Sequence, residues 1–224
     1  MIKFKNSEIT PENIYKKRRS FIKSIGLGAS SLAISAIPFA NKSSASERDK
    51  LTSYKDITTY NNYYEFGTSK SDPYKNSQTF KTTPWEIAIE GEVEKPIKLS
   101  MEEISEMFVS EERIYRLRCV EGWSMVIPWM GFSLSELLSK VNPTNKAKFV
   151  EFESVYDPAQ MKGQRYPVLN WPYNEGLRID EAMHPLTTVV TGLYGKKLPN
   201  QNGAPLRIFI PWKYGFKSAK AIVK

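Results

Sequence analysis

Residues 113–123 read RIYRLRCVEGW and contain the only cysteine of the 224-residue chain, Cys119. The spacing of Arg113, Arg116 and Arg118 predicts a strand that carries the three arginines on one face, with Leu117 and Cys119 on the other. Positive charge near a thiol favours the thiolate, which is the form that binds metals. Cys119 is therefore a candidate metal ligand, although the same pattern also fits an inert core cysteine or a cysteine that links two chains.

The first 45 residues have the order of an export signal. Arg18 and Arg19 stand in a basic stretch, an apolar run of small residues extends from Ile25 to Ala40, and Ala45 ends a possible cleavage site. The arginine pair is typical of the twin-arginine route, which exports folded proteins to the periplasm. We therefore expect a twin-arginine signal peptide over residues 1–45 and one domain over residues 46–224. A basic helix or an uncut anchor is the alternative, but residues 25–40 are few for a membrane span, which needs about 20 apolar residues.

The charge of the chain is concentrated in this leader. The formal net charge of the chain is +8. Residues 1–45 hold eight Lys or Arg and two Glu, a net charge of +6, so residues 46–224 carry a net charge of only +2. A domain with so little net charge gives no reason to expect nucleic-acid binding. A single cysteine also excludes an internal disulfide, which exported proteins commonly have.

The rest of the pattern predicts an α+β domain with short helices and long loops. Residues 46–60 are polar and are expected to be a loosely held N-terminus. A serine cap at Ser100 with Glu103 three residues on predicts a short helix to Phe108, and a second short helix is expected to start at Phe132. The loop Asp157–Glu175 is expected to form an open rim. The expected strands are 85–93, 113–119, 148–154, 187–191 and 206–211.

Four separated motifs together resemble the sulfite-oxidase superfamily of molybdopterin enzymes. They read YNNYYEFG at 60–67, RCVEGW at 118–123, NQNGAPLR at 200–207 and PWKYGFKSAK at 211–220. The first motif and the leader narrow the resemblance to the catalytic subunits of the bacterial periplasmic protein-methionine-sulfoxide reductases. It covers about residues 54–224.

The resemblance implies a sulfite-oxidase-type domain of mixed β-sheets that binds a molybdenum–molybdopterin cofactor (Mo-MPT). Cys119 matches the metal ligand. Glu121 would lie near the metal as a second catalytic residue and possible proton source, or would simply end a strand. Ser154 stands where the family usually has threonine. The positions that match cofactor contacts are Asn61, Tyr64, Glu65, Ser154, Asn202, Arg207, Ser218, Ala219 and Lys220.

The same resemblance implies partners. One cysteine and one histidine, His184, leave no haem or iron–sulfur motif, so electrons must come from another protein. In the family this donor is a membrane haem-containing subunit, and the substrates are oxidised proteins. The family continues beyond Lys224, so we expect a C-terminal part to be missing. The alternatives are a sulfite-oxidising enzyme of the same superfamily and a truncated cofactor-binding domain without activity. His184 is expected to serve a loop or core hydrogen bond.

The arginine pair gives the first testable prediction. Changing Arg18 and Arg19 to lysine keeps the charge but removes the feature that defines the route, so the precursor should stay in the cytoplasm. Immunoblots of fractionated cells measure this, with the matched Lys3→Arg/Lys5→Arg variant as the control that is exported normally. Mature protein in the periplasm at wild-type level from the arginine variant would rule the route out.

Overall fold

The computed structural model describes residues 50–224, so the predicted leader lies outside the described part of the chain. None of the helices within this range has both the length and the apolar character needed to cross a membrane. The sheets, helices and turns reported below all belong to residues 50–224.

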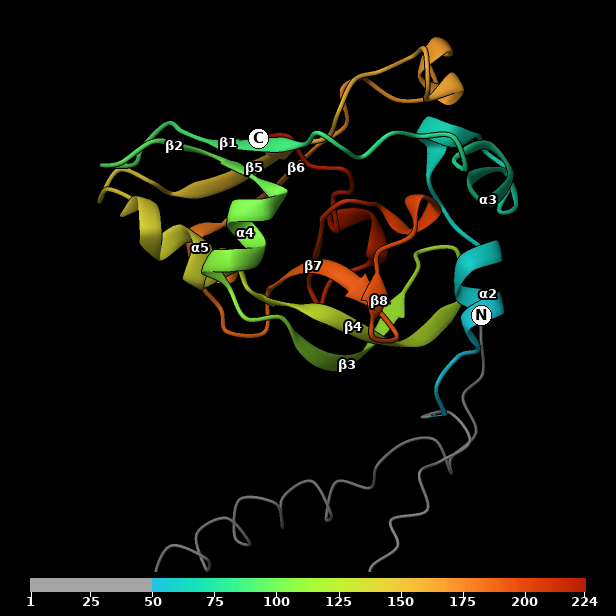
Figure 1. Cartoon of the computed structure of the whole chain (residues 1–224), viewed down its shortest axis with the longest axis horizontal. Helices are drawn as coiled ribbons and strands as arrows, with labels where there is room; N and C mark the ends of the chain where they lie inside the picture. The colour runs from blue at the N-terminus through green and yellow to red at the C-terminus, as the bar shows by residue number, and fades with distance from the viewer. Residues whose placement is uncertain (1–49) are drawn as a thin grey trace, which may run out of the picture. The chain divides into compact units, whose positions relative to one another are not determined.

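The centre of the fold is a five-stranded antiparallel sheet (Figure 1). The strand order is β3-β4-β7-β8, and β9 also pairs with β7. β4 carries almost continuous burial along its ten residues, so its sequence shows no alternation, and sequence reasoning missed it. The strands are β3 (Glu111–Arg118), β4 (Ser124–Ser133), β7 (Thr188–Leu193), β8 (Lys196–Lys197) and β9 (Arg207–Phe209).

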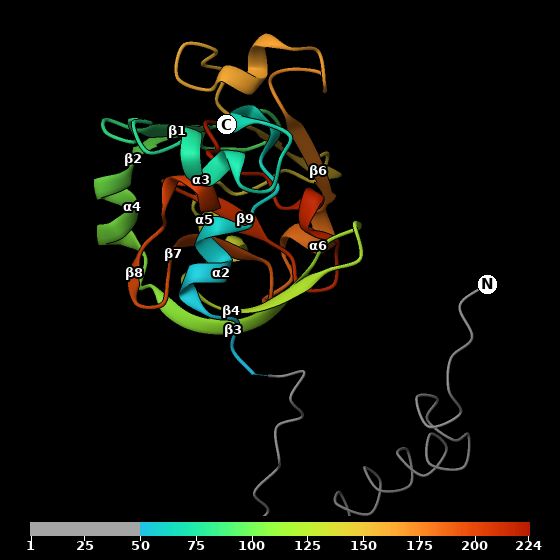
Figure 2. The ribbon, with the colours of Figure 1, turned by 90° about the vertical axis from the view of Figure 1, so that its right-hand side faces the viewer.

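Two antiparallel hairpins lie on the other side of the core, above the central sheet in the view of Figure 1. The first pairs β1 (Glu86–Ile89) with β2 (Ile97–Ser100), and the second pairs β5 (Phe149–Glu153) with β6 (Asn174–Arg178). The loop between β5 and β6 stands out from the body in both Figures 1 and 2.

The helices are short, as the sequence predicts. The α-helices are α2 (Tyr54–Thr59), α3 (Asp72–Asn76), α4 (Met101–Met107), α5 (Leu134–Val141) and α6 (Ile179–Ala182). Single 3₁₀ turns are η3 (Tyr64–Phe66), η4 (Lys162–Arg165), η5 (Asn200–Asn202) and η6 (Gly215–Lys217).

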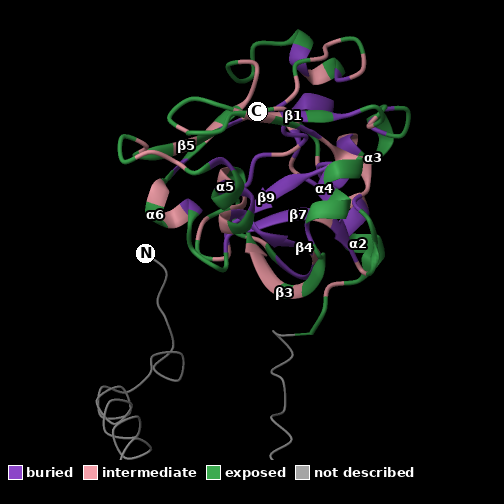
Figure 3. Ribbon diagram, turned by 60° about the vertical axis from the view of Figure 1, so that its left-hand side comes forward, coloured by how far each residue is buried: buried purple, intermediate pink, exposed green. Residues whose placement is uncertain are grey.

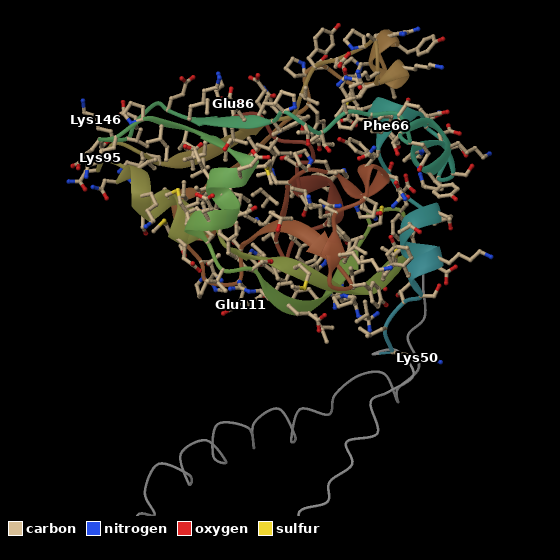
Figure 4. The ribbon with its side chains drawn as sticks, viewed as in Figure 1. Lys50, Phe66, Glu86, Lys95, Glu111 and Lys146 are labelled. Atoms are coloured by element: carbon tan, nitrogen blue, oxygen red, sulfur yellow. The ribbon has the colours of Figure 1, made fainter. Side chains whose placement is uncertain are left out.

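The core consists of two clusters of buried side chains. The larger one is enclosed by the hairpins, α4, α5 and β9, and Phe108 stacks there on Phe132 with ring centroids 4.3 Å apart. The smaller one surrounds Trp129 and Phe209. Strands β4, β7 and β9 contribute side chains to both clusters, and Figure 3 colours them largely as buried, whereas β3 remains partly exposed at the sheet edge. Figure 4 labels Glu111 on that edge and Phe66 beside α3.

Several sequence predictions hold with small shifts of boundary. Ser100 caps α4 as predicted, because its Oγ accepts the Glu103 N–H at 3.1 Å and the Glu103 carboxylate accepts the Ser100 N–H at 2.8 Å. The second helix begins at Leu134, after Ser133, because Phe132 belongs to β4. The five predicted strands correspond to β1, β3, β5, β7 and β9.

Two predictions were wrong. Residues 46–49 of the predicted loose N-terminus lie outside the described range, and residues 50–60 are not loose throughout, because Tyr54–Thr59 forms α2 and buries Ile57 in the smaller cluster. The three arginines do not share a face, because Arg113 is an odd number of residues from Arg116 and so points to the opposite side of β3. The Arg113 guanidinium donates to Pro185 O at 3.0 Å and to Thr188 Oγ1 at 3.3 Å.

Close contact between β4 and β7 gives a prediction about stability. A Cβ at Gly131 would lie 2.0 Å from the Val189 carbonyl oxygen, which belongs to the backbone and cannot turn aside. We expect Gly131→Ala to lower the free energy of unfolding by about 1–3 kcal/mol or more, measured by urea denaturation. Gly176→Ala is the matched control in β6, where the nearest atom would be 3.8 Å away. Equal stability of the two variants would contradict the close packing of β4 on β7 at Gly131.

Candidate functional site

A cavity of about 330 Å³ opens beside Cys119. Segments far apart in the sequence meet there: the turn after α2, the turn between β3 and β4, the loop before β6, and the chain on both sides of β9. A second, apolar cavity of about 740 Å³ lies elsewhere and is lined by none of the predicted site residues. The predicted residues that line the first cavity are Asn61, Tyr64, Glu65, Cys119, Glu121, Asn202, Arg207 and Lys220.

Cys119 sits in a tight turn that directly follows β3. Its N–H donates to the Trp123 carbonyl at 2.9 Å, and its carbonyl accepts the Gly122 N–H at 3.2 Å. Gly122 has a φ of +87°, a left-handed conformation that favours glycine. The side chain of Cys119 is only 8% exposed, so solvent reaches the sulfur mainly through the cavity. The turn therefore holds the thiol in a fixed place on the cavity wall.

Glu121 gathers three donors beside this thiol. Its carboxylate accepts hydrogen bonds from Asn62 Nδ2 at 3.2 Å and Trp123 Nε1 at 3.4 Å, and it pairs with Lys70 Nζ at 2.8 Å. Asn62 Nδ2 also lies 3.9 Å from Cys119 Sγ. The Lys70 hydrogen bond is the main reason that the pKa of Glu121 is lowered. An ionised Glu121 accepts hydrogen bonds and is poorly suited to supply a proton.

Two buried amides leave acceptors without partners. Asn61 and Asn202 both donate their Nδ2 atoms to the carbonyl of Ile57, at 2.9 and 3.0 Å. The Oδ1 atom of each amide is buried and has no hydrogen-bond partner within residues 50–224. Buried polar atoms are nearly always paired, so two free acceptors on one cavity wall fit a bound group that presents N–H donors.

Two cations line the inner wall of the cavity. Arg207 is buried, donates Nη1 to the Asn202 carbonyl at 3.0 Å and lies over the Trp129 ring at 5.1 Å. Lys220 is half-buried as a whole, and its Nζ lies 5.0 Å from the centre of the buried Tyr63 ring. In the described part of the chain neither cation forms an ion pair.

The ionisation of this wall reflects burial. Burial lowers the pKa of Arg207 to about 10. Burial and then the charge of Arg207 lower the pKa of Lys220 to about 8. Burial also raises the pKa of the Glu65 carboxyl, against the opposing charge of Lys220. The wall therefore holds two cations and one carboxyl group that resists ionisation. The excess of positive charge suits an anionic group such as a phosphate.

Three predicted residues do not line the cavity. Ser154, Ser218 and Ala219 are fully buried behind its wall. Ser218 is next to the site, because its carbonyl accepts Arg207 Nη2 at 3.5 Å. The hydroxyls of Ser154 and Ser218 have no partner among the described residues.

Sequence reasoning missed several residues of the site. Asn62 and Trp123 stand inside quoted motifs, but no signal marked the contact with Glu121. Lys70 and Tyr173 lie outside the motifs, and only the folded chain brings them here. The Tyr173 hydroxyl lies 2.9 Å from both Glu175 Oε1 and the Phe216 carbonyl. His184 serves its loop as expected, since its Nδ1 accepts the Leu186 N–H at 3.2 Å.

A metal held by this chain would find few protein ligands. Within residues 50–224 there is no group of three or more His, Cys, Asp or Glu side chains that could hold a metal ion. A metal at Cys119 would therefore take one thiolate from the protein and its other ligands from a cofactor.

Comparison with known proteins identifies the family. Residues 74–224 match the oxidoreductase molybdopterin binding domain. The chain belongs to this family. The family assignment and the α+β fold predicted from the sequence are thus confirmed.

Relatives in this family have named activities. The chain is 53% identical to the protein-methionine-sulfoxide reductase catalytic subunit MsrP of Xanthomonas axonopodis, over 98% of this chain and 72% of the relative. It is 50% identical to the MsrP of Burkholderia mallei, over 97% and 71%. The solved sulfane dehydrogenase SoxCD of Paracoccus pantotrophus shares the fold alone, with a TM-score of 0.54 and 13% identity over 96% of this chain and 58% of that one.

The buried ammonium of Lys220 generates a prediction. Burial lowers the pKa of Lys220 to about 8, below the ordinary lysine value of 10.5. Its charge therefore lowers the free energy of unfolding below pH 8, and this penalty disappears as the pH rises toward 10.5. Cofactor-free Lys220→Met should therefore be about 1–3 kcal/mol more stable than the wild type at pH 7, with a smaller difference at pH 10. Urea denaturation at the two pH values measures it.

The control for this prediction is Lys146→Met, at an exposed site far from Phe66 in Figure 4, which should change stability little at either pH. The same Lys220→Met protein should retain less cofactor when it is purified after cofactor loading. If the cofactor-free variant is instead less stable than the wild type, Lys220 stabilises the fold and the prediction is wrong.

Proposed function

We propose that this protein is a molybdenum-dependent reductase of methionine sulfoxide in exported proteins. The observation that carries the proposal is the composition of one cavity, in which a fixed thiol, two unpaired amide acceptors and two buried cations meet. The relatives at about 50% identity are catalytic subunits of protein-methionine-sulfoxide reductases, and they support the choice of substrate.

The residues present fit molybdenum–molybdopterin. Cys119 would be the metal ligand, and Asn61, Tyr64, Glu65 and Asn202 would face the pterin, whose ring presents N–H donors and acceptors. When bound, the centre supplies a two-electron redox couple. The residues that would hold its phosphate end, directly or through the buried segment behind the wall, are Arg207, Ser218, Ala219 and Lys220. Ser154 would be a further contact of the cofactor.

Reduction of a sulfoxide breaks its S–O bond, consumes two electrons and two protons, and releases a sulfide and water. Of the chain's own residues, Cys119 contributes a sulfur on a backbone that the hydrogen bonds of its turn hold in place. The Glu121 carboxylate, whose pKa is lowered mainly by the Lys70 hydrogen bond, accepts from Trp123 and from Asn62, which lies 3.9 Å from that sulfur. The inner cavity is enclosed by buried side chains, so hydrogen bonds and charges there act more strongly than in bulk solvent.

The electrons and the location are part of the proposal. One cysteine and one histidine in these 224 residues exclude a covalent haem attachment motif, bis-histidine haem ligation and an iron–sulfur cluster held by cysteines. We infer that a membrane haem-containing subunit delivers electrons and that oxidised proteins are the substrates. We place the protein in the periplasm, exported by the twin-arginine route, on the basis of the arginine pair and apolar run of residues 1–45.

The cofactor-loaded protein, with a reduced dye as electron donor, provides the test. It should consume the dye with an oxidised methionine-rich protein and should not reduce an acceptor with sulfite. Oxidation of sulfite without reduction of the oxidised protein would assign the protein to the sulfite-oxidising alternative. Neither activity would favour a cofactor-binding domain without catalysis.

The matched control in this assay is Cys119→Ala. Loss of the metal ligand should lower activity by more than the roughly 10–100-fold loss that follows mutation of residues that only support a ligand. The electron paramagnetic resonance spectrum of the metal should also change. Metal and pterin contents are measured alongside, so that loss of cofactor is not mistaken for loss of chemistry. An unaltered spectrum in a fully loaded variant would show that the thiol is not a ligand.

A further inference from the structure

Exposed apolar side chains surround the mouth of the Cys119 cavity. They come from four separate segments: the end of α2, the turn after β3, the loop between β5 and β6, and η6. We call them the apolar rim. Its members all line the cavity, with exposed fractions of 43% for Tyr60, 61% for Val120, 37% for Leu169 and 47% for Phe216.

Contacts with neighbouring residues hold this rim in place. The Tyr60 ring packs edge-on against Trp123, with centroids 5.3 Å apart, and Trp123 in turn donates to Glu121. Phe216 stacks on Tyr214 at 6.5 Å, and its carbonyl lies 2.9 Å from the Tyr173 hydroxyl. A surface ordered in advance loses little conformational entropy when a ligand binds.

The loop that carries Leu169 is also anchored, although it stands out from the body in Figure 1. The middle of the loop, the turn η4, packs closely on the turn that lines the cavity, since a Cβ on Gly163 would lie 1.9 Å from the Tyr64 carbonyl oxygen. Gln164 is buried and bonds both Asp157 N at 2.7 Å and the Val155 carbonyl at 2.8 Å. Nearer β6, Trp171 Nε1 donates to the Tyr166 carbonyl at 2.9 Å. Leu169 therefore has a defined place at the mouth.

Apolar side chains gathered around a reactive cavity mark an interaction site, since water does not favour their exposure. Lys70 and Glu121, the charged pair beside Cys119, neutralise each other at 2.8 Å and so attract neither sign of substrate strongly. A methionine side chain is short, so a sulfoxide that enters the cavity brings the neighbouring residues of its own chain against the mouth. Burial of apolar neighbours there is favourable, whereas charged neighbours would lose hydration.

We propose that the apolar rim binds the apolar residues that flank a methionine sulfoxide in a polypeptide, so that the neighbours of the oxidised residue determine substrate choice. This inference rests on the proposed function. Leu169 and Phe216 are the specificity-determining residues that test it best, because both line the mouth and neither adjoins Cys119 in the sequence.

The experiment compares two short peptides with the same central methionine sulfoxide, one flanked by leucine and valine and the other by serine. The cofactor-loaded wild type should reduce the apolar peptide with a kcat/KM about tenfold higher, the effect expected from partial burial of one or two side chains. Leu169→Ser and Phe216→Ser should each remove most of this preference. Their kcat/KM for free methionine sulfoxide should fall far less than for the apolar peptide.

The matched control is Val168→Ser, which changes an apolar residue of the same loop that is 47% exposed but does not line the cavity. It should keep the wild-type preference. Equal reduction of the two peptides by the wild type, or an undiminished preference in both rim variants, would overturn the inference. If no sulfoxide is reduced at all, the proposed function fails, and fluorescence anisotropy of the two labelled peptides then decides the rim: equal affinity for both rejects it.

Discussion

The burial of positive charge is the constraint on which the site depends. Arg207 and Lys220 lie on the inner wall of the cavity, and both have a pKa lowered by burial. The Trp129 and Tyr63 rings and the Asn202 carbonyl offset part of the lost hydration, but none of them carries a full negative charge. Such an arrangement opposes folding of the cofactor-free protein and favours binding of an anion. The site thus exchanges some stability for affinity.

The same wall shows how distant segments are joined. The carbonyl of Ile57 accepts from both Asn61 and Asn202, so α2 and η5 meet at a single oxygen atom. Because that oxygen takes both amide donors, both amide oxygens remain free for a ligand. A parallel bridge between Arg118 and Tyr214 joins the end of β3 to the segment that leads to Lys220. The thiol and the cations therefore share one cavity through backbone contacts.

The cavity differs between its interior and its mouth. The inner wall is polar and charged, and suits a cofactor with N–H donors and a phosphate. The mouth is apolar, and suits a substrate that must be captured without strong charge recognition. Membership of the molybdopterin binding family agrees with the interior, while the rim concerns the choice among oxidised polypeptides.

The sequence by itself determined the family, the α+β class and most of the residues around the cavity. Cys119 could be found because it is the only thiol and stands in a motif with Glu121, and Asn61, Asn202 and Arg207 stand in motifs whose order is distinctive. Local rules also fixed the Ser100 cap, since that contact spans only three residues.

The tertiary structure decided what depends on pairing and burial. β4 could not be predicted, because burial on both faces removes the alternation of apolar and polar residues that marks a strand. The prediction put Arg113 on the wrong face of β3, and only the folded structure shows its contact with Thr188. Lys70 bonds Glu121, 51 residues away, and Leu169 reaches the mouth on a loop whose middle packs on Tyr64. Contacts of this kind leave no local pattern in a sequence, because they arise only when the whole chain has folded.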